Sequence, residues 1–177
     1  MTPGETPRFA ADRMLARLAR WLRLLGADTI FDPNLGGAAM LARARAEGRV
    51  MLTRDKRLRT APDVLYLESN DFRGQLREVM RRYPFDRAKA GFTRCSRCNS
   101  LLVEVGREAL RRRVPPFVYA SFERFAECPG CGRIYWGATH LERMTREIDR
   151  LGLPEAPDKS QPDAPVLSSR RKSQGED

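Results

Sequence analysis

The stretch RFAADRMLARLARWLRLLG, residues 8–26, decides the fold because it joins a short strand to an amphipathic helix. Residues 8–11 are the expected strand, and Asp12 is placed to cap a helix that ends at Leu25, just before a glycine. Apolar side chains recur every three or four residues and give the helix one face for a core. The other face carries four arginines: Arg13, Arg17, Arg20 and Arg23.

The alternation of strand and helix continues to about residue 83. We expect strands at 28–31, 49–53 and 64–67, and helices at 38–47 and 71–83. Strands that alternate with helices favour a parallel sheet flanked by helices, so the sequence predicts an α/β domain. It contains no glycine-rich phosphate loop of the Walker or dinucleotide-binding type.

Two cysteine pairs mark a different kind of module. Cys95 and Cys98 form one C-x-x-C pair, and Cys128 and Cys131 form the other. Each pair can offer two thiolates to one tetrahedral ion, so we predict a small zinc ribbon with four cysteine ligands. A thioredoxin-like redox pair and an iron–sulfur cluster are the alternatives. Four cysteine ligands would fill the coordination sphere of zinc, so this metal would stabilise the module and perform no chemistry.

We expect three segments along the chain: the sheet domain at 1–91, the ribbon with a terminal helix at 92–153, and a disordered tail at 154–177. The tail is rich in proline and polar residues and has little to bury. Within the middle segment, apolar runs predict strands at 101–105, 118–122 and 134–136, then a helix at 141–151.

The chain is strongly basic, with 33 Lys and Arg against 23 Asp and Glu and a formal net charge of +10. This surplus lies in the predicted folded body, which favours a polyanionic partner such as RNA. A GC-rich coding bias would also give an arginine-rich composition. No stretch has the apolar length of a membrane span or a secretory signal, so we expect a cytoplasmic location, where cysteines stay reduced.

Three aspartates follow predicted strands: Asp12 after 8–11, Asp55 after 49–53, and Asp71 just past 64–67. The carboxyl ends of parallel strands share one edge of a sheet, so we expect the three carboxylates to converge. Such a cluster needs a hard divalent cation, and oxygen ligands suit Mg²⁺ or Mn²⁺. The alternative is that Asp12 and Asp71 only cap helices and Asp55 only shapes a turn.

Three motifs in this order closely resemble the Mut-seven C-terminal RNase family: DRMLARLARWLRLLG at 12–26, GRVMLTRD at 48–55, and the cysteine pairs closing with YWGATH at 135–140. The resemblance covers residues 8 to about 146. It implies a PIN-like nuclease domain followed by a zinc ribbon. It also implies metal-dependent RNA cleavage in which Asp12, Asp55 and Asp71 hold Mg²⁺ or Mn²⁺ and carry the catalysis.

One region departs from the family's pattern. PIN-type sites add a carboxylate near the start of the helix after the second strand, but residues 35–39 read LGGAA here. Asp32 is the nearest substitute, and Glu47 lies at the far end of that helix. Two main hypotheses follow: a Mg²⁺- or Mn²⁺-dependent endoribonuclease, or a non-catalytic RNA- or ribosome-binding adaptor that has lost part of the acidic site. A protein-docking module is a third, which would leave the positive charge without a role.

Basic and aromatic residues near these motifs are the candidate RNA contacts: Arg13, Arg17, Arg54, Lys56, Trp136 and His140. Arginine suits phosphate oxygens, and aromatic rings stack on unpaired bases. For Trp136 the competing interpretation is that it packs the ribbon against the sheet domain. His140, the only histidine, is not needed as a zinc ligand.

Overall fold

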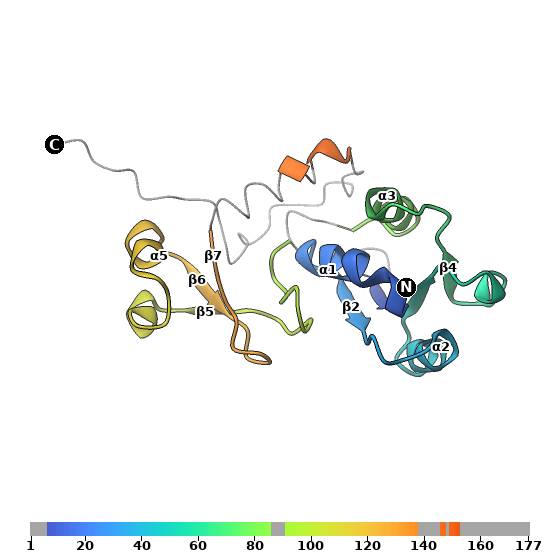
Figure 1. The fold of residues 1–177 in the computed structure, drawn as a ribbon, viewed down its shortest axis with the longest axis horizontal. Coiled ribbons are helices and arrows are strands. Elements are labelled where there is room, and N and C mark those ends of the chain that lie inside the picture. The colour runs from blue at the N-terminus through green and yellow to red at the C-terminus, as the bar shows by residue number, and fades with distance from the viewer. Residues whose placement is uncertain (1–6, 86–90, 138–145, 148, 153–177) are drawn as a thin grey trace.

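A parallel sheet organises the first part of the chain (Figure 1). The computed structural model describes residues 7–85, 91–137, 146–147 and 149–152. Four parallel strands lie in the order β2-β1-β3-β4. Their bounds are β1 Arg8–Ala11, β2 Asp28–Phe31, β3 Val50–Thr53 and β4 Val64–Tyr66. The predicted α/β class is confirmed.

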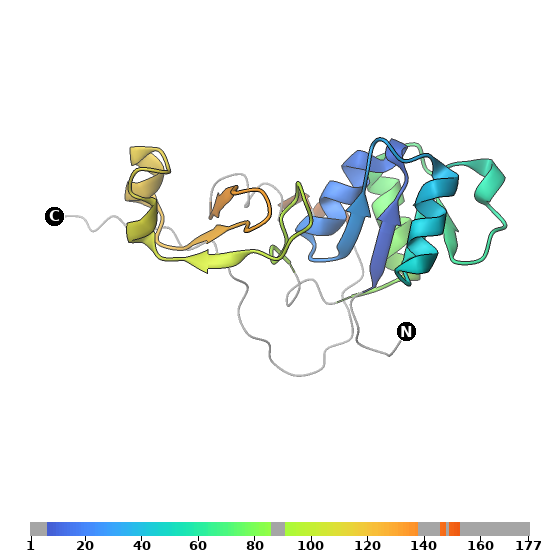
Figure 2. The ribbon, with the colours of Figure 1, turned by 90° about the horizontal axis from the view of Figure 1, so that it is seen from below.

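Helices cover both faces of this sheet (Figure 2). Helices α1 (Ala16–Leu24) and α3 (Phe72–Arg82) pack together on one face, and α2 (Gly37–Ala46) packs on the other. Alternate residues of β1 serve the two sides, since Phe9 joins the α1–α3 core and Ala10 joins the core under α2. Within the described ranges, no helix combines the length and apolar character needed to cross a membrane.

Two single 3₁₀ turns complete this domain, and both follow the carboxyl end of a strand. Turn η1 (Arg13–Leu15) follows β1 and leads into α1, so the predicted first helix begins as a tighter turn. Turn η2 (Lys56–Leu58) follows β3. The residues between each strand and its turn therefore lie at one edge of the sheet.

The second module is a three-stranded antiparallel sheet in the order β5-β6-β7. Its strands are β5 Val103–Val105, β6 Phe125–Glu127 and β7 Ile134–Trp136. A 3₁₀ turn, η3 (Arg107–Leu110), and a short helix, α5 (Pro116–Ser121), lie between β5 and β6. Together with the four cysteines described below, this sheet agrees with the predicted ribbon.

The expected strand at 118–122 is wrong, because most of this segment belongs to α5 and the strand follows at β6. Pro116 occupies the first turn of α5, where its fixed φ fits and its missing N–H has no intrahelical partner. Val118 and Phe122 are four residues apart and both pack into one small core with Phe125. A short apolar run fits either a strand or a helix, and here packing decides.

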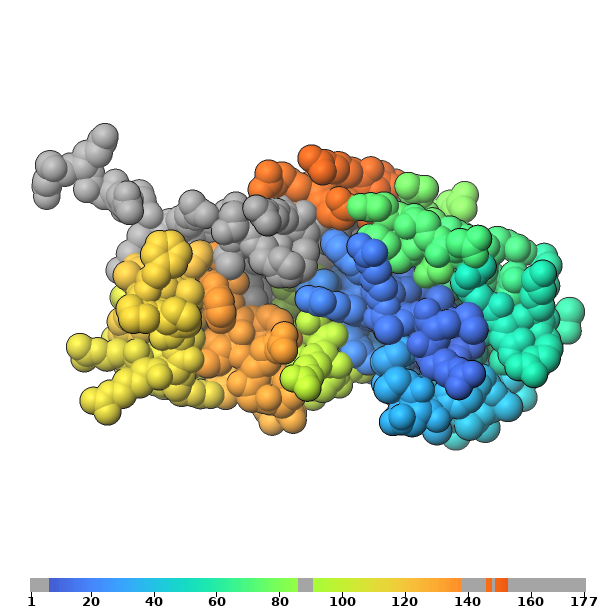
Figure 3. All heavy atoms as spheres, in the orientation of Figure 1, coloured from blue at the N-terminus to red at the C-terminus, as the bar shows by residue number. Residues whose placement is uncertain are grey.

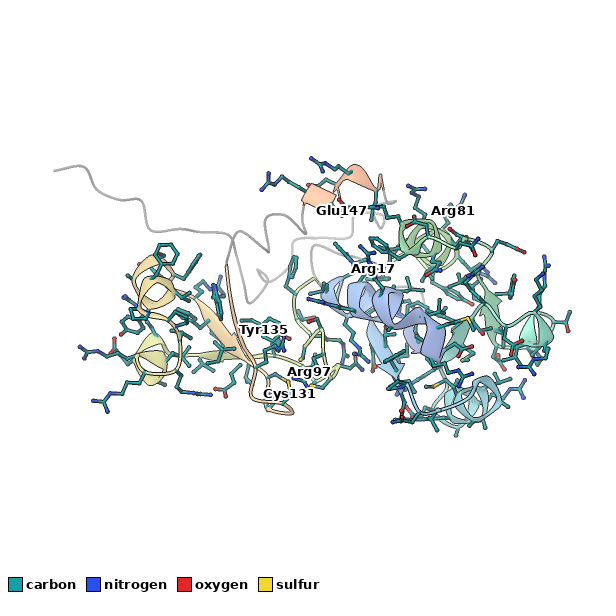
Figure 4. The ribbon with its side chains drawn as sticks, in the orientation of Figure 1. Arg17, Arg81, Arg97, Cys131, Tyr135 and Glu147 are labelled. Atoms are coloured by element: carbon teal, nitrogen blue, oxygen red, sulfur yellow. The ribbon has the colours of Figure 1, made fainter. Side chains whose placement is uncertain are left out.

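The last described residues return to the first domain. Leu151 is 5% exposed and belongs to the α1–α3 core. Glu147 forms an ion pair with Arg73 of α3 (Figure 4). The segment that the sequence groups with the ribbon thus contacts the sheet domain here. The predicted tail at 154–177 lies outside the described residues.

A buried arginine of α1 joins the two modules. Arg23 is 5% exposed, and its Nε donates to the carbonyl oxygen of Thr29 on β2 at 2.7 Å. Its guanidinium also donates to the carbonyl oxygen of Arg97, inside the first cysteine pair, at 2.6 Å. One side chain therefore connects α1, β2 and the ribbon. In Figure 3 the first residues of the ribbon lie against α1.

A second set of contacts covers β2, an edge strand of the sheet. Asn99 of the ribbon accepts a hydrogen bond from Thr29 N at 3.0 Å and donates to Asp28 Oδ1 at 2.8 Å. Arg49 donates to the same carboxylate oxygen at 2.6 Å. Burial opposes ionisation of Asp28, but the hydrogen bonds from Arg49 and Asn99 and the charges of Arg49 and Arg94 outweigh it and hold its pKa below the usual value. The ribbon therefore protects an exposed sheet edge.

We expect Arg23→Ala to lower the free energy of unfolding by about 2 kcal/mol or more, because it leaves buried carbonyl oxygens without their donor. Arg20→Ala is the matched control, since Arg20 is an exposed arginine of the same helix. That control should change stability by no more than about 0.5 kcal/mol. Urea denaturation followed by circular dichroism measures both, and equal stability of the two variants would contradict the assigned role of Arg23.

Candidate functional site

The hydroxyl of Thr53 connects the first two predicted aspartates. Thr53 is the last residue of β3, is fully buried, and donates to Asp12 Oδ2 at 2.6 Å. The same oxygen of Thr53 accepts a hydrogen bond from the backbone N of Asp55 at 3.0 Å. Because β1 and β3 are neighbours, the two aspartates follow adjacent strand ends. Two of the three carboxylates therefore share one edge of the sheet.

Both carboxylates face the start of α2. A Cβ at Gly37 would lie 3.6 Å from Asp12 Oδ2 and 3.8 Å from Asp55 Oδ2, so the two oxygens lie near one point. Gly37 is the first residue of α2, where unpaired N–H groups give the helix its positive end. This is the region in which the sequence lacks a carboxylate. The pair thus has a glycine beside it where a third acidic side chain would reach it.

Asp12 does not use its carboxylate as a helix cap. Its side chain makes no hydrogen bond to η1, and within the described residues it forms no ion pair. It is only 2% exposed, and the Thr53 hydroxyl is its hydrogen-bond donor. Burial of a charge without a cationic partner is costly. The capping interpretation therefore does not account for the Asp12 side chain.

Asp55 forms an ion pair with Arg57, and a divalent cation can compete with this arginine. Its Oδ1 accepts from Arg57 N at 3.0 Å, and its Oδ2 pairs with the Arg57 guanidinium at 2.7 Å. These hydrogen bonds lower the pKa of Asp55. The Arg57 side chain is 88% exposed, and pairs of this kind contribute little to stability. A divalent ion can compete with Arg57 for this carboxylate.

Asp71, the third predicted aspartate, caps α3. Its Oδ2 accepts from Arg73 N at 3.1 Å and from Gly74 N at 3.2 Å. Across the described part of the chain, only the cysteines form a group of three or more potential ligands within 4.8 Å of one another. Asp12, Asp55 and Asp71 therefore do not form one compact ligand set, and Asp71 uses its carboxylate to cap α3.

The two acidic substitutes considered from the sequence have other contacts. Asp32 follows β2 and accepts a hydrogen bond from Asn34 N at 2.9 Å. Glu47 lies at the C-terminal end of α2, where it pairs with Arg43 at 2.7 Å and with Arg49 at 2.6 Å. Glu47 is thus held at the end of the helix opposite to Gly37.

The predicted RNA-binding side chains of this domain lie close to the aspartates along the chain. Arg13 and Lys56 are exposed in η1 and η2, the two turns that follow the acidic pair. Arg54 donates to Asn70 Oδ1, and its Nε is the only fully buried side-chain nitrogen or oxygen without a hydrogen-bond partner in the described ranges. Arg17 stacks over an aromatic ring of α3. Arg54 Nε is therefore an unpaired donor that the protein encloses.

The four cysteines gather at one point in the ribbon. Their Sγ atoms all lie within 4.8 Å of one another, with Cys95 and Cys131 at 3.6 Å and Cys98 and Cys128 at 3.2 Å. A tetrahedral zinc with Zn–S bonds of about 2.3 Å spaces its sulfurs by roughly 3.8 Å. All four are free thiols. The cysteines are thus positioned to bind a metal ion, and their spacing agrees with zinc.

The thiols of this cluster have unequal pKa values, which bear on metal binding. Although burial opposes it, hydrogen bonds with Ser100 and with neighbouring thiols lower the pKa of Cys98 to about 6. Burial and the contact with Cys98 raise the pKa of Cys128 to about 12. The cluster is therefore only partly ionised at neutral pH by itself. A metal ion requires the thiolate form and would drive the remaining protons off.

Two neighbouring aromatic residues of β7, Tyr135 and the candidate Trp136, have contacts inside the ribbon. The hydroxyl of Tyr135 lies 3.1 Å from Cys95 Sγ and accepts from Ser96 N at 3.2 Å (Figure 4). Trp136 is half-buried and packs with the α5–β6 core, so its described contacts lie within the ribbon. His140 lies outside the described residues.

Sequence reasoning named the aspartates but not Thr53. A signal was present, because Thr53 lies two residues before Asp55 at a strand end. Side chains two residues apart in an extended segment point to the same side. A hydroxyl at that position is therefore placed to reach both a neighbouring strand and the following turn.

A family model described as the Mut7-C RNAse domain matches residues 7–148. The matched segment contains the parallel sheet, the acidic pair and all four cysteines. No curated protein and no solved structure matches the chain.

Metal analysis of the purified chain should give about one zinc per chain, because four thiolates complete a tetrahedral site. Cys128→Ser removes a buried ligand and should lose the zinc and destabilise the ribbon. Leu101→Ala, at an exposed ribbon position, is the control and should keep both. Elemental analysis and thermal denaturation are the measurements, and a fully folded chain without metal would rule the prediction out.

Saturating Mn²⁺ should raise the melting temperature by several degrees, because a ligand at about 100 times its Kd adds about 2.7 kcal/mol. Asp12→Asn should abolish this increase, and Thr53→Val should weaken it because the carboxylate loses its donor. Asp63→Asn is the control, because Asp63 is exposed and directly precedes β4, at the opposite edge of the sheet. Differential scanning fluorimetry in divalent-free buffer gives the baseline. An Mn²⁺ effect that persists in Asp12→Asn would place the ion elsewhere.

Proposed function

Because the chain belongs to the Mut7-C RNAse domain family, we propose that it is an endoribonuclease that hydrolyses RNA phosphodiester bonds with Mg²⁺ or Mn²⁺ held by Asp12 and Asp55. The observation that carries the proposal is the 2.6 Å contact of the Thr53 hydroxyl, which fixes the Asp12 carboxylate beside Asp55. Carboxylate oxygens at one point are the donors that hard divalent cations prefer. Family membership by itself indicates a nuclease.

The protein's own groups would hold and balance the charges of the reaction. A divalent ion at the pair would supply water activation and charge stabilisation at the phosphodiester. The Thr53 hydroxyl donates a hydrogen bond to Asp12 Oδ2, and this bond orients the carboxylate toward the start of α2. Arg57 neutralises Asp55 in the free protein and would be released when a cation binds, since its side chain is exposed.

Basic residues beside the pair would bind the phosphate backbone. Arg54 directly precedes Asp55, and its half-buried guanidinium is of the kind that pairs with phosphate oxygens. Arg13 and Lys56 project from the two turns that follow the aspartates. The net charge of +10 would draw RNA to this surface over longer distances.

The ribbon would serve the nuclease domain as a structural module. We assign zinc to its four cysteines, because their sulfur spacing fits a tetrahedral zinc ion and zinc binds cysteine as the thiolate. The ribbon covers the edge of β2, and we expect it to aid RNA binding. The cytoplasm suits this assignment, because it contains RNA and keeps cysteines reduced.

One observation favours a second candidate, a non-catalytic RNA- or ribosome-binding adaptor. Gly37 stands where a third carboxylate would reach the pair, and a site with fewer ligands binds a metal more weakly. An adaptor would keep the fold and the positive charge and would use the acidic pair only structurally. It predicts salt-dependent RNA binding that Asp12→Asn leaves intact or strengthens.

RNA cleavage with and without Mn²⁺ or Mg²⁺ separates the two candidates. The ribonuclease should cut single-stranded RNA only when the ion is present, and Asp12→Asn and Asp55→Asn should each reduce the rate by on the order of 100-fold or more. Asp63→Asn should cut like the unaltered chain. Absence of cleavage, or cleavage that survives both substitutions, would end the catalytic proposal.

Gly37→Asp tests the same site by adding a carboxylate, where the preceding variants remove one. The Cβ position is 3.3 Å from Leu58 Cδ1, the end of a movable side chain, so an aspartate fits after a small shift. In a ribonuclease the third carboxylate should strengthen Mn²⁺ binding and lower the Mn²⁺ concentration needed for cleavage. Gly36→Asp, at the preceding exposed position with open space around it, is the matched control. An equal response of the two variants would contradict the location of the metal.

A further inference from the structure

A small hollow, lined in part by residues that follow Asp12 in the sequence, is not used by the proposed reaction. Its volume is about 210 Å³, and it opens between the start of α1 and the start of α3. This is below the roughly 300–1,000 Å³ of sites for drug-sized molecules, so it suits one ring system. Its polar wall is formed by Asn70, Asp71 and Gln75, and its apolar wall includes Met14 and Phe72.

Gln75 places a largely buried polar side chain in the wall of the hollow. The residue is 6% exposed, and its amide nitrogen donates to the carbonyl oxygen of Ser69 at 3.0 Å. Among the described residues no group donates to its Oε1. In those ranges, Arg54 Nε is the only fully buried side-chain nitrogen or oxygen without a partner. Gln75 Oε1 also has no partner there, so it is not fully buried and must remain accessible. A largely buried glutamine thus presents a free acceptor to the hollow that it lines.

The neighbouring polar groups add a second acceptor and one donor. Asp71 uses Oδ2 to cap α3, and no described group occupies its Oδ1. Asn70 uses Oδ1 to accept from Arg54, which leaves its amide nitrogen as a free donor. The wall therefore has an excess of acceptors. A ligand that fits it carries an exocyclic amino group, whose two N–H bonds can reach two acceptors at once.

The rest of the hollow suits a flat ring. Phe72 is held from α1 by Trp21, with ring centroids 5.6 Å apart and an interplanar angle of 24°. Arg17 lies 3.8 Å from the same ring centroid, and its own side chain is exposed (Figure 4). A guanidinium over a ring is itself planar and offers a second surface on which a base can stack.

The hollow is also connected to the acidic pair through short segments. Met14 lies in η1, two residues after Asp12. Arg54, which directly precedes Asp55, holds Asn70 at the opposite wall. An RNA strand with a phosphate near the acidic pair could therefore place a neighbouring base in the hollow.

We propose that this hollow is a base-binding subsite for single-stranded RNA that prefers a base with an exocyclic amino group over uracil. Uracil has one ring N–H and two carbonyl oxygens, so it leaves one of the two acceptors unpaired. Cytosine has the same size and offers its N4 amino group instead, which carboxylate side chains accept in nucleic-acid complexes. The subsite rests on the proposed ribonuclease function for its purpose, although its binding can be measured separately.

The test is a binding measurement in divalent-free buffer, where no cleavage occurs. Fluorescently labelled ten-nucleotide oligouridine probes carry one central cytidine, uridine or abasic residue, and fluorescence anisotropy gives each Kd for the full chain. We expect the cytidine probe to bind on the order of tenfold tighter than the uridine probe, as one well-placed base contact allows. Equal binding of the three probes would overturn the subsite.

Two variants locate the preference. Met14→Trp fills the mouth of the hollow from a position that is 55% exposed, so it should remove the preference without unfolding the chain. Leu101→Trp, at a ribbon position that is 59% exposed, is the matched control and should keep it. Gln75→Leu removes the acceptor, and its thermal denaturation curve checks folding. A preference that survives both Met14→Trp and a folded Gln75→Leu would overturn the assignment.

The outcomes also separate this inference from the ribonuclease proposal. A cytidine preference in a chain that never cleaves RNA with Mn²⁺ would sink the catalytic proposal and keep the subsite. Mn²⁺-dependent cleavage that Asp12→Asn abolishes, without any base preference in binding, would sink the subsite and keep the nuclease.

Discussion

The hydroxyl of Thr53 is the contact on which the functional edge of the sheet depends. It donates to Asp12 at 2.6 Å and accepts from the backbone of Asp55 at 3.0 Å, so one atom sets the positions of two carboxylates from adjacent strands. This is possible because β1 and β3 are neighbours in a parallel sheet and end at the same edge. A valine would fill the same space but would leave a buried carboxylate without its donor.

The arginines of α1 show how one predicted helix face serves several purposes. From the sequence they form a single stripe, but the structure buries Arg23 between the two modules and lays Arg17 on an aromatic ring. Arg23 binds backbone carbonyls of β2 and of the first cysteine pair. Metal binding by the ribbon would therefore stabilise more than the ribbon, because the ordered cysteine turn is also the acceptor for this buried guanidinium.

Local sequence patterns predicted the sheet domain well because each of its elements has a clear period and a clear end. Pattern failed at 118–122, where the run is too short for its period to distinguish a strand from a helix and burial of Val118 and Phe122 decides. Strand order predicted that Asp12 and Asp55 lie at one edge of the sheet, and the structure places them there. For Asp71 the sequence allowed either a ligand or a helix cap, and the hydrogen bonds to Arg73 N and Gly74 N show the cap.

The missing third carboxylate has a consequence for charge that favours a substrate as anionic as RNA. Two carboxylates with one divalent ion are neutral, whereas three leave a net negative charge that repels phosphate. In the proposed ribonuclease, the positive end of α2 at Gly37 would act on the phosphate without competition from a third acid. In the free protein, Arg57 supplies positive charge at Asp55. The glycine would therefore weaken metal binding while it makes the same place more favourable for the phosphodiester.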